Sequence, residues 1–142
     1  MIIKIFEYNR ITSKKGEGDT MFKSSSVTIV VEDLNKAEKF YVETLGLKVQ
    51  FKVESHLVQL EAPGLTIGLV HPREGQDANP GISGSVHIGL EVQELDTAMK
   101  LLESRGVEFQ PIMEEEATRI AYFSDPEGNP LYLIELKTNP EM

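Results

Sequence analysis

Hydrophobic and polar positions alternate along the chain in blocks that predict one strand, one helix and three further strands. The apolar run Val27 to Val31 is typical of a buried strand, and Asp33 behind it is a favourable N-cap. In "LNKAEKFYVETLG", residues 34–46, apolar side chains recur at helical spacing, and Gly46 marks the helix end. Three short strands follow in "LKVQFKV", "HLVQLEA" and "LTIGLV". The pattern predicts a βαβββ unit.

The same order of elements occurs a second time. "VHIGLEVQELDTAMKLLESRGVEFQ" holds a strand, an acidic turn, an amphipathic helix and a terminating glycine, and "QPIMEE", "RIAYFS" and "LYLIEL" follow as three strands. At a constant offset, Val31 matches Val92 and Leu34 matches Leu95. This repeat predicts an α+β fold of two tandem βαβββ modules in a pseudo-twofold arrangement, with helix-free sheet faces forming a curved-sheet cup. We expect a small ligand in the cavity between the repeats.

Polar and glycine-containing segments predict the domain boundaries. The stretch "SKKGEGDT" is typical of a linker, so residues 1–22 are expected to be an N-terminal extension and linker. Residues 1–20 are either an appended edge strand or a segment upstream of the native start, and the sequence leaves both open. The domain over residues 23–138 is divided into repeat one at 24–71, a connector at 72–84 and repeat two at 85–137.

Composition narrows the classes of partner. A formal net charge of −9 argues against nucleic acid and suits cationic ligands better than anionic ones. The chain has no cysteine, which excludes disulfides and thiolate metal sites. Its apolar start is too short for a secretory signal, and no apolar run approaches the roughly 18 residues of a membrane span. These features predict a cytoplasmic protein without a membrane partner. The acidic stretch "MEEEATR", residues 113–119, is expected to be a solvated loop.

Three stretches carry a resemblance to a known family. They are "VVEDLNKAEKFYVETLGLKV" at 30–49, "VHIGLEV" at 86–92 and "FSDPEGNPLYLIEL" at 123–136. In this order, and with the internal repeat, they resemble the vicinal oxygen chelate superfamily of glyoxalases, bleomycin-resistance proteins and extradiol dioxygenases. In the last stretch Asp125 and Pro126 preset a turn, and Gly128 with Asn129 is expected to supply the positive φ that a hairpin needs.

The resemblance implies four metal-ligand positions, one on the first and one on the last strand of each repeat. Here they are occupied by Ser26, Gly68, His87 and Tyr132. Of these only the histidine is a good donor to a divalent metal. Strand alternation turns His71 and Glu135 to the other face and Glu91 lies too far along its strand, so Glu61 is the one nearby carboxylate that remains as a substitute. We therefore predict no metal and no other cofactor, with a divalent metal as the alternative.

The resemblance and the missing donors together predict a protein that binds a small organic molecule, cationic or aromatic, without a complete metal site. This corresponds to the bleomycin-resistance branch of the family. The expected ligand-binding residues are His87, Tyr132, Ser26, Gly68, Glu61 and Tyr122. No residue is assigned as catalytic, and His87 is the candidate because imidazole titrates near neutrality.

The alternative function is a glyoxalase- or dioxygenase-like enzyme, a lyase or an oxidoreductase, that uses His87 in a divergent metal site or a metal-free one. Whether the chain is an enzyme therefore stays open at this stage. We also expect a homodimer, by resemblance and because two curved open sheets leave edges that pair with other strands.

Overall fold

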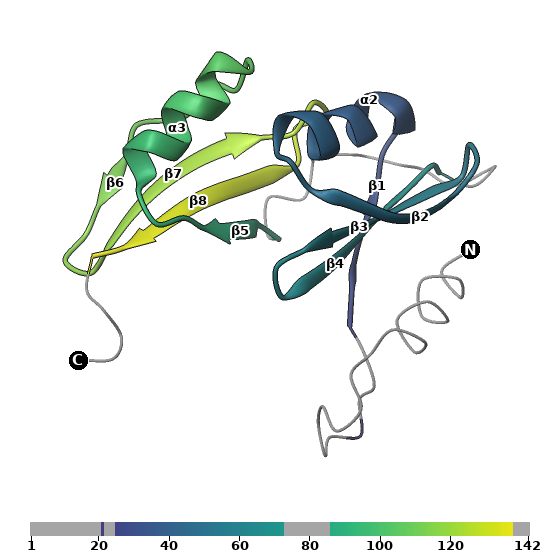
Figure 1. The fold of residues 1–142 in the computed structure, drawn as a ribbon, viewed down its shortest axis with the longest axis horizontal. Helices are drawn as coiled ribbons and strands as arrows, with labels where there is room; N and C mark the ends of the chain where they lie inside the picture. Colours follow the sequence, from purple (N-terminus) through teal and green to yellow (C-terminus); the bar gives the residue numbers. More distant parts are fainter. Residues whose placement is uncertain (1–20, 22–24, 73–85, 138–142) are drawn as a thin grey trace. The chain divides into compact units, whose positions relative to one another are not determined.

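Two compact units make up the chain, Met1–Ala78 and Asn79–Met142. The computed structural model describes residue 21, residues 25–72 and residues 86–137 (Figure 1). Each unit contains one βαβββ module, so the predicted α+β class with two such modules is confirmed. The expected extension at 1–22, except residue 21, and nearly all of the connector lie outside the described residues. The cup formed by pairing the modules stays a prediction.

The first module has a four-stranded sheet with the order β1-β4-β3-β2. Its elements are β1 (Val27–Val30), α2 (Leu34–Lys39), β2 (Lys48–Val53), β3 (Leu57–Ala62) and β4 (Leu65–Val70). Strand β1 runs parallel to β4, and the other pairs are antiparallel. The three short strands expected after the helix are thus present and adjacent.

The helix of the first module begins as the sequence predicts and ends differently. The Asp33 side chain accepts a hydrogen bond from the backbone N–H of Lys36 at 3.0 Å, which caps α2. After Lys39 the chain continues in a π-helical turn over Phe40–Thr44, in which the Leu45 N–H donates to the Phe40 carbonyl. Because that bond spans five residues, the last turn is wider than an α-helical one. Gly46 then ends the helix with a φ of 82°, as expected.

One face of the first sheet packs against α2, and the other is free of helices. Lys52 of β2 bonds to Glu38 of α2, and its register partner is Val58 of β3. Strand alternation therefore places the side chains of Val58, Leu60 and Ala62 on the helix side of the sheet. The opposite, helix-free face carries Leu57, Gln59, Glu61, Thr28 and Gly68.

The second module repeats this arrangement with the sheet order β5-β8-β7-β6. Its elements are β5 (Ile88–Glu91), α3 (Leu95–Ser104), β6 (Met113–Glu114), β7 (Thr118–Ser124) and β8 (Pro130–Leu136). Strand β5 is an edge strand that runs parallel to β8. Helix α3 packs on β7 and β8, along one side of the sheet in Figure 1.

A distant carboxylate caps helix α3. The backbone N–H of Leu95 donates to Oε1 of Glu135, which lies on β8, at 2.6 Å, whereas within the described chain Glu94 makes no side-chain capping bond. Glu135 therefore faces the helix, as strand alternation predicts. Buried Ala121 and Phe123 of β7 share this side, so Tyr122 points to the helix-free face.

The hairpin between β7 and β8 is organised by Asp125. Its Oδ1 accepts hydrogen bonds from the N–H groups of Glu127 and Asn129, both at 2.9 Å. Gly128 has a φ of 86°, as expected. The expectation that Asn129 shares this conformation was wrong, because Ser55 is the only non-glycine with positive φ among the described residues. Asn129 instead donates from its amide to Oδ2 of Asp125 at 2.8 Å.

Candidate functional site

Three rings meet on the helix-free face of the second module. They come from His87, directly before β5, from Tyr122 on β7 and from Tyr132 on β8. The centroid of the Tyr122 ring lies 5.7 Å from that of His87, at an interplanar angle of 83°, and 5.5 Å from that of Tyr132, at 54°. Aromatic pairs interact favourably at such separations and tilts. The structure thus brings three of the predicted ligand-binding residues into one group, called the ring cluster below.

The ring cluster is accessible from outside the module. His87 is exposed, and both tyrosines are half-buried. Tyr122 and Tyr132 are direct register partners, which fixes the two phenol rings side by side on neighbouring strands. The cluster therefore offers a π-rich surface that spans β5, β8 and β7.

Sequence reasoning missed Gly89, which is the register partner of Tyr132 on β5. A Cβ atom built on Gly89 would lie 2.2 Å from Cζ of Tyr132 and 2.4 Å from its Oη. The phenol ring of Tyr132 therefore lies directly against the main chain of β5. A glycine inside an apolar strand is the signal that could have indicated this close approach.

The other predicted residues, Ser26, Gly68 and Glu61, belong to the first module. Ser26 comes directly before β1, and Gly68 of β4 lies between Thr28 and Gln59 in the sheet register. Within this module they share the helix-free face by strand alternation. The structure thus divides the six predicted residues into two groups of three, one on each module.

A chain of amides and a carboxylate crosses the helix-free face of the first module. Nε2 of fully buried Gln59 donates to Oε1 of Gln50 at 2.9 Å, and Nε2 of Gln50 lies 3.4 Å from Oε1 of Glu61. Gln50 occupies a register shift in β2, which brings it beside both residues of β3. The two glutamines were not predicted, although a polar residue at an inward position of "HLVQLEA" is a recognisable signal. The chain of hydrogen bonds ends on the exposed Glu61 carboxylate.

The residues at the four family positions do not fit a divalent metal ion. Gly68 offers no side chain, Ser26 is a weak donor, and the Tyr132 ring is laid against Gly89. In the parts of the chain that the structure describes, no group of three His, Asp or Glu residues is placed to hold a metal. We therefore derive no chemical step through a metal at these positions.

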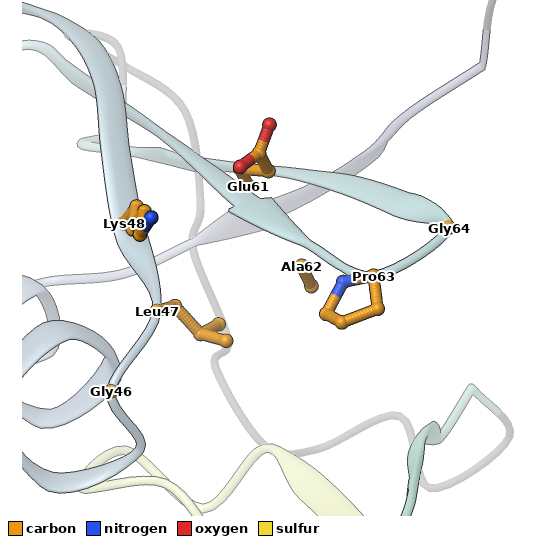
Figure 2. A pocket seen from close by; sticks show the side chains of 7 residues that line it. All are labelled: Gly46, Leu47, Lys48, Glu61, Ala62, Pro63 and Gly64. Carbon is orange, nitrogen blue, oxygen red and sulfur yellow. The ribbon is translucent and has the colours of Figure 1, made fainter.

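The first module also has a hollow of about 390 Å³, which lies between the end of its helix and the β3–β4 turn. It is lined by Gly46, Leu47, Lys48, Glu61, Ala62, Pro63 and Gly64. Figure 2 shows the Glu61 carboxylate pointing away from Leu47 and Pro63. Its lining is otherwise apolar or glycine, apart from Lys48, the register partner of Glu61.

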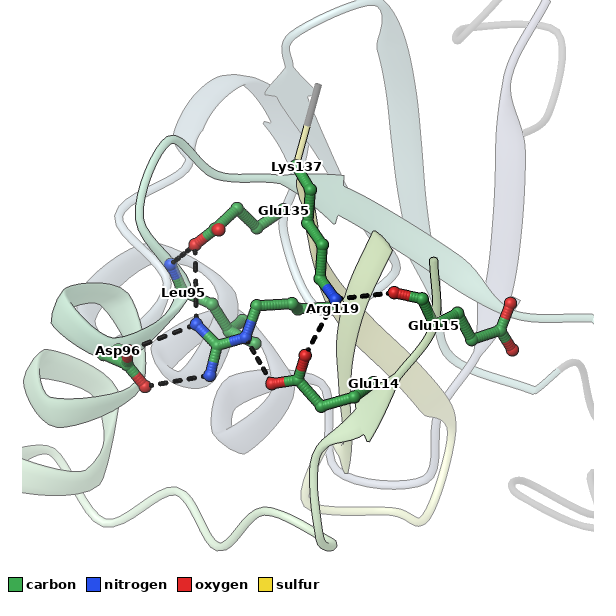
Figure 3. A network of polar contacts seen from close by, with 7 residues as sticks. All are labelled: Leu95, Asp96, Glu114, Glu115, Arg119, Glu135 and Lys137. Atoms are coloured by element: carbon green, nitrogen blue, oxygen red, sulfur yellow. Dashed lines mark hydrogen bonds and ion pairs between the residues drawn. The ribbon is translucent and has the colours of Figure 1, made fainter. Parts of the chain in front are cut away.

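A charged network lies beside helix α3 (Figure 3). It is on the face opposite the ring cluster, because Arg119 and Glu135 alternate with Tyr122 and Tyr132 along β7 and β8. Nε of Arg119 lies 2.7 Å from Glu114, and its Nη1 lies 3.2 Å from Asp96 and 3.8 Å from Glu135. Hydrogen bonds from Arg119 and then Lys137 lower the pKa of Glu114. Hydrogen bonds to Asp96 and then Glu114 raise the pKa of Arg119. The network joins α3 to β6, β7 and β8.

The expectation that residues 113–119 form a solvated loop holds for the exposure of residues 113–117 but is wrong for the backbone at both ends of the stretch. Met113 and Glu114 form β6, and β7 already begins at Thr118. Glu114 is held by ion pairs to Arg119 and Lys137. The stretch itself did not show Lys137 as a partner, because this residue follows β8 and is distant in the sequence.

No helix among the described residues is long and apolar enough to cross a membrane.

Comparison with known proteins places the chain in a family. The family model described as "Glyoxalase/Bleomycin resistance protein/Dioxygenase superfamily" matches residues 23–133. The uncharacterized protein YwkD of Bacillus subtilis is 31% identical over 120 residues, which cover 77% of this chain and 93% of YwkD. A superfamily member of known structure from Sphaerobacter thermophilus is 32% identical, with a TM-score of 0.61 over 80% of this chain and 99% of that one.

TnmS3, described as an antibiotic binding protein from a Streptomyces species, has a similar structure. It is 27% identical, with a TM-score of 0.59 over 80% of this chain and 97% of TnmS3. The resemblance found in the three sequence stretches is therefore confirmed, and the chain belongs to the glyoxalase/bleomycin resistance protein/dioxygenase superfamily.

Proposed function

We propose that this protein binds a small organic molecule and that it does so without a metal ion. The observation that carries the proposal is the ring cluster of His87, Tyr122 and Tyr132 on a helix-free sheet face. Rings that are half-buried or exposed offer flat apolar area together with polar edges, which suits an organic ligand. The donor chemistry at the family positions supports binding without a metal.

The charge of the chain supports a planar ligand that carries a positive charge or a hydrogen-bond donor. The formal net charge is −9, and a cation is attracted both by that field and by the faces of aromatic rings. The description of TnmS3 as an antibiotic binding protein also supports binding of an organic molecule.

A titration with the planar cationic dye proflavine tests this function. We expect saturable binding to the protein, and weaker binding of a planar naphthalene sulfonate, because its charge is repelled. Replacing Tyr122 or His87 by leucine should weaken proflavine binding by about tenfold, the size of one lost aromatic contact. His56, exposed in the β2–β3 turn, provides the matched control, and His56→Leu should leave binding unchanged. Absence of dye binding, or equal effects of His87→Leu and His56→Leu, would contradict the proposal.

A second candidate is a metal-free lyase that uses His87 to move a proton. One observation favours it: the His87 imidazole is exposed and packs edge-on against the Tyr122 phenol. An exposed imidazole can exchange a proton with a bound molecule. His87→Gln distinguishes the two functions, since it should abolish turnover of a substrate while a pure binding protein shows no turnover to lose.

We also propose a homodimer in the cytoplasm, as the sequence predicts. The open edge strands of each four-stranded sheet support pairing with a second copy. Size-exclusion chromatography with light scattering measures the mass directly, and a mass of one chain across the micromolar range would contradict the dimer.

A further inference from the structure

We infer that Gly89 is a positioning residue of the ring cluster, which holds the Tyr132 ring against β5 and so determines the shape of the surface that a ligand meets. The inference rests on the proposed function. It starts from the direct pairing of Gly89 with Tyr132 and from the 2.2 Å between a Cβ at Gly89 and Cζ of Tyr132. Non-bonded carbon atoms do not approach so closely, since their optimal separation is roughly 3.5–4.0 Å. Any side chain at position 89 therefore displaces the ring.

The order of the strands explains why the position of the Tyr132 ring affects the other two rings. His87 lies at the start of β5 and Tyr122 on β7, with β8 between these strands. Neighbouring strands are about 4.8 Å apart, so β5 and β7 are separated by two such spacings. The rings of His87 and Tyr122 therefore reach a centroid distance of 5.7 Å only if they lean over β8. Tyr132 stands on β8 itself, and by lying toward Gly89 it leaves this space to the other two rings.

A larger residue at position 89 should therefore change the site and leave the core intact. Gly89 lies on the helix-free face, and the buried residues of β5 and β8, such as Ile88 and Leu131, are on the other face. The displaced Tyr132 ring would turn over β8, toward the place where His87 and Tyr122 meet. A planar ligand could then no longer lie flat on the ring cluster, because the Tyr132 ring would project from it.

A purely structural role is the competing explanation. An aromatic ring that covers a glycine on an edge strand also stabilises the pairing of the strands. Such a role predicts a change in melting temperature alone. The positioning role predicts a change in ring contacts and in ligand affinity as well.

The test combines NMR of the rings with proflavine titration of four proteins: wild type, Gly89→Ala, Tyr132→Leu and the double variant. In the wild type we expect cross-peaks between the Tyr132 ring and the Gly89 Hα atoms, and between the rings of His87 and Tyr122. Gly89→Ala should remove the first and weaken the second, and should lower proflavine affinity by about tenfold. In the Tyr132→Leu background, Gly89→Ala should change neither the His87–Tyr122 cross-peaks nor the affinity, because no ring is left to displace.

Equal effects of Gly89→Ala in both backgrounds would overturn the inference, as would unchanged ring contacts and affinity with a lowered melting temperature. If Gly89→Ala does not fold, the wild-type spectrum still decides, since absence of the Tyr132–Gly89 cross-peak would also overturn it. If the wild type does not bind proflavine, the proposed function fails, while the cross-peaks still test the positioning of Tyr132.

Discussion

At the scale of single residues, Asp125 shows how one carboxylate fixes a turn. It is 5% exposed and accepts hydrogen bonds from two backbone N–H groups and one side-chain amide. The bond to Glu127, two residues on, forms a local turn closed by the side chain. The hairpin joins β7 to β8, so this residue also sets the register that pairs Tyr122 with Tyr132.

We expect Asp125→Ala to lower the free energy of unfolding by about 2–3 kcal/mol, because three part-buried donor groups lose a charged acceptor. Glu116→Ala is the control, because Glu116 is exposed between β6 and β7. It should change the free energy of unfolding by less than about 0.5 kcal/mol. Urea denaturation measures both. Equal free energies for the two variants would show that the turn does not depend on the carboxylate.

At the scale of elements, the two helices are equivalent in the repeat and are capped in different ways. Asp33 caps α2 from its own N-terminus, which a local pattern predicts. Glu135 caps α3 from β8, and the sequence could not predict this contact because it depends on how the helix packs on the sheet. The sequence did not predict the π-helical turn after Lys39 either, whereas both terminating glycines followed from local conformation alone.

Glu135→Ala should lower the free energy of unfolding by about 1 kcal/mol, the usual cost of a lost helix cap. Glu94→Ala is the matched control, because Glu94 is the N-cap residue of α3 by position and its side chain makes no capping bond within the described chain. Thermal unfolding of both variants measures the difference. A larger loss for Glu94→Ala would contradict the assignment of the cap.

The stability of the contact between β6 and β7 should depend on pH, since Glu114 of β6 forms an ion pair with Arg119 of β7. Its pKa is lowered in the folded protein, first by the hydrogen bond from Arg119. A carboxyl with a lowered pKa stabilises the fold fully above its unfolded value, here 4.5, and this contribution is lost as the pH falls through the folded value. We expect Glu114→Gln to lower the melting temperature above pH 4.5 and to approach the wild type well below it. A difference that grows on acidification would contradict this sign.

At the scale of the whole molecule, the repeat and the three family stretches predicted two βαβββ modules correctly. Tyr122, one of the expected ligand-binding residues, faces away from the helix, whereas its neighbour Phe123 is buried on the helix side. A polar residue and a glycine inside apolar strands are signals for Gln59 and Gly89, but the contacts of Gln59 with Gln50 and of Gly89 with Tyr132 could not be predicted from them. They depend on which residues are opposite each other across strands, and pattern alone does not fix that register.

We propose above that the ring cluster binds an organic molecule without a metal ion. The most direct measurement is a proflavine titration with and without the chelator EDTA, alongside elemental analysis of the purified protein. We predict the same affinity in both titrations, no stoichiometric metal, and weaker binding for His87→Leu in each. A stoichiometric metal that is lost on His87→Leu, together with dye binding that disappears in EDTA, would contradict the claim.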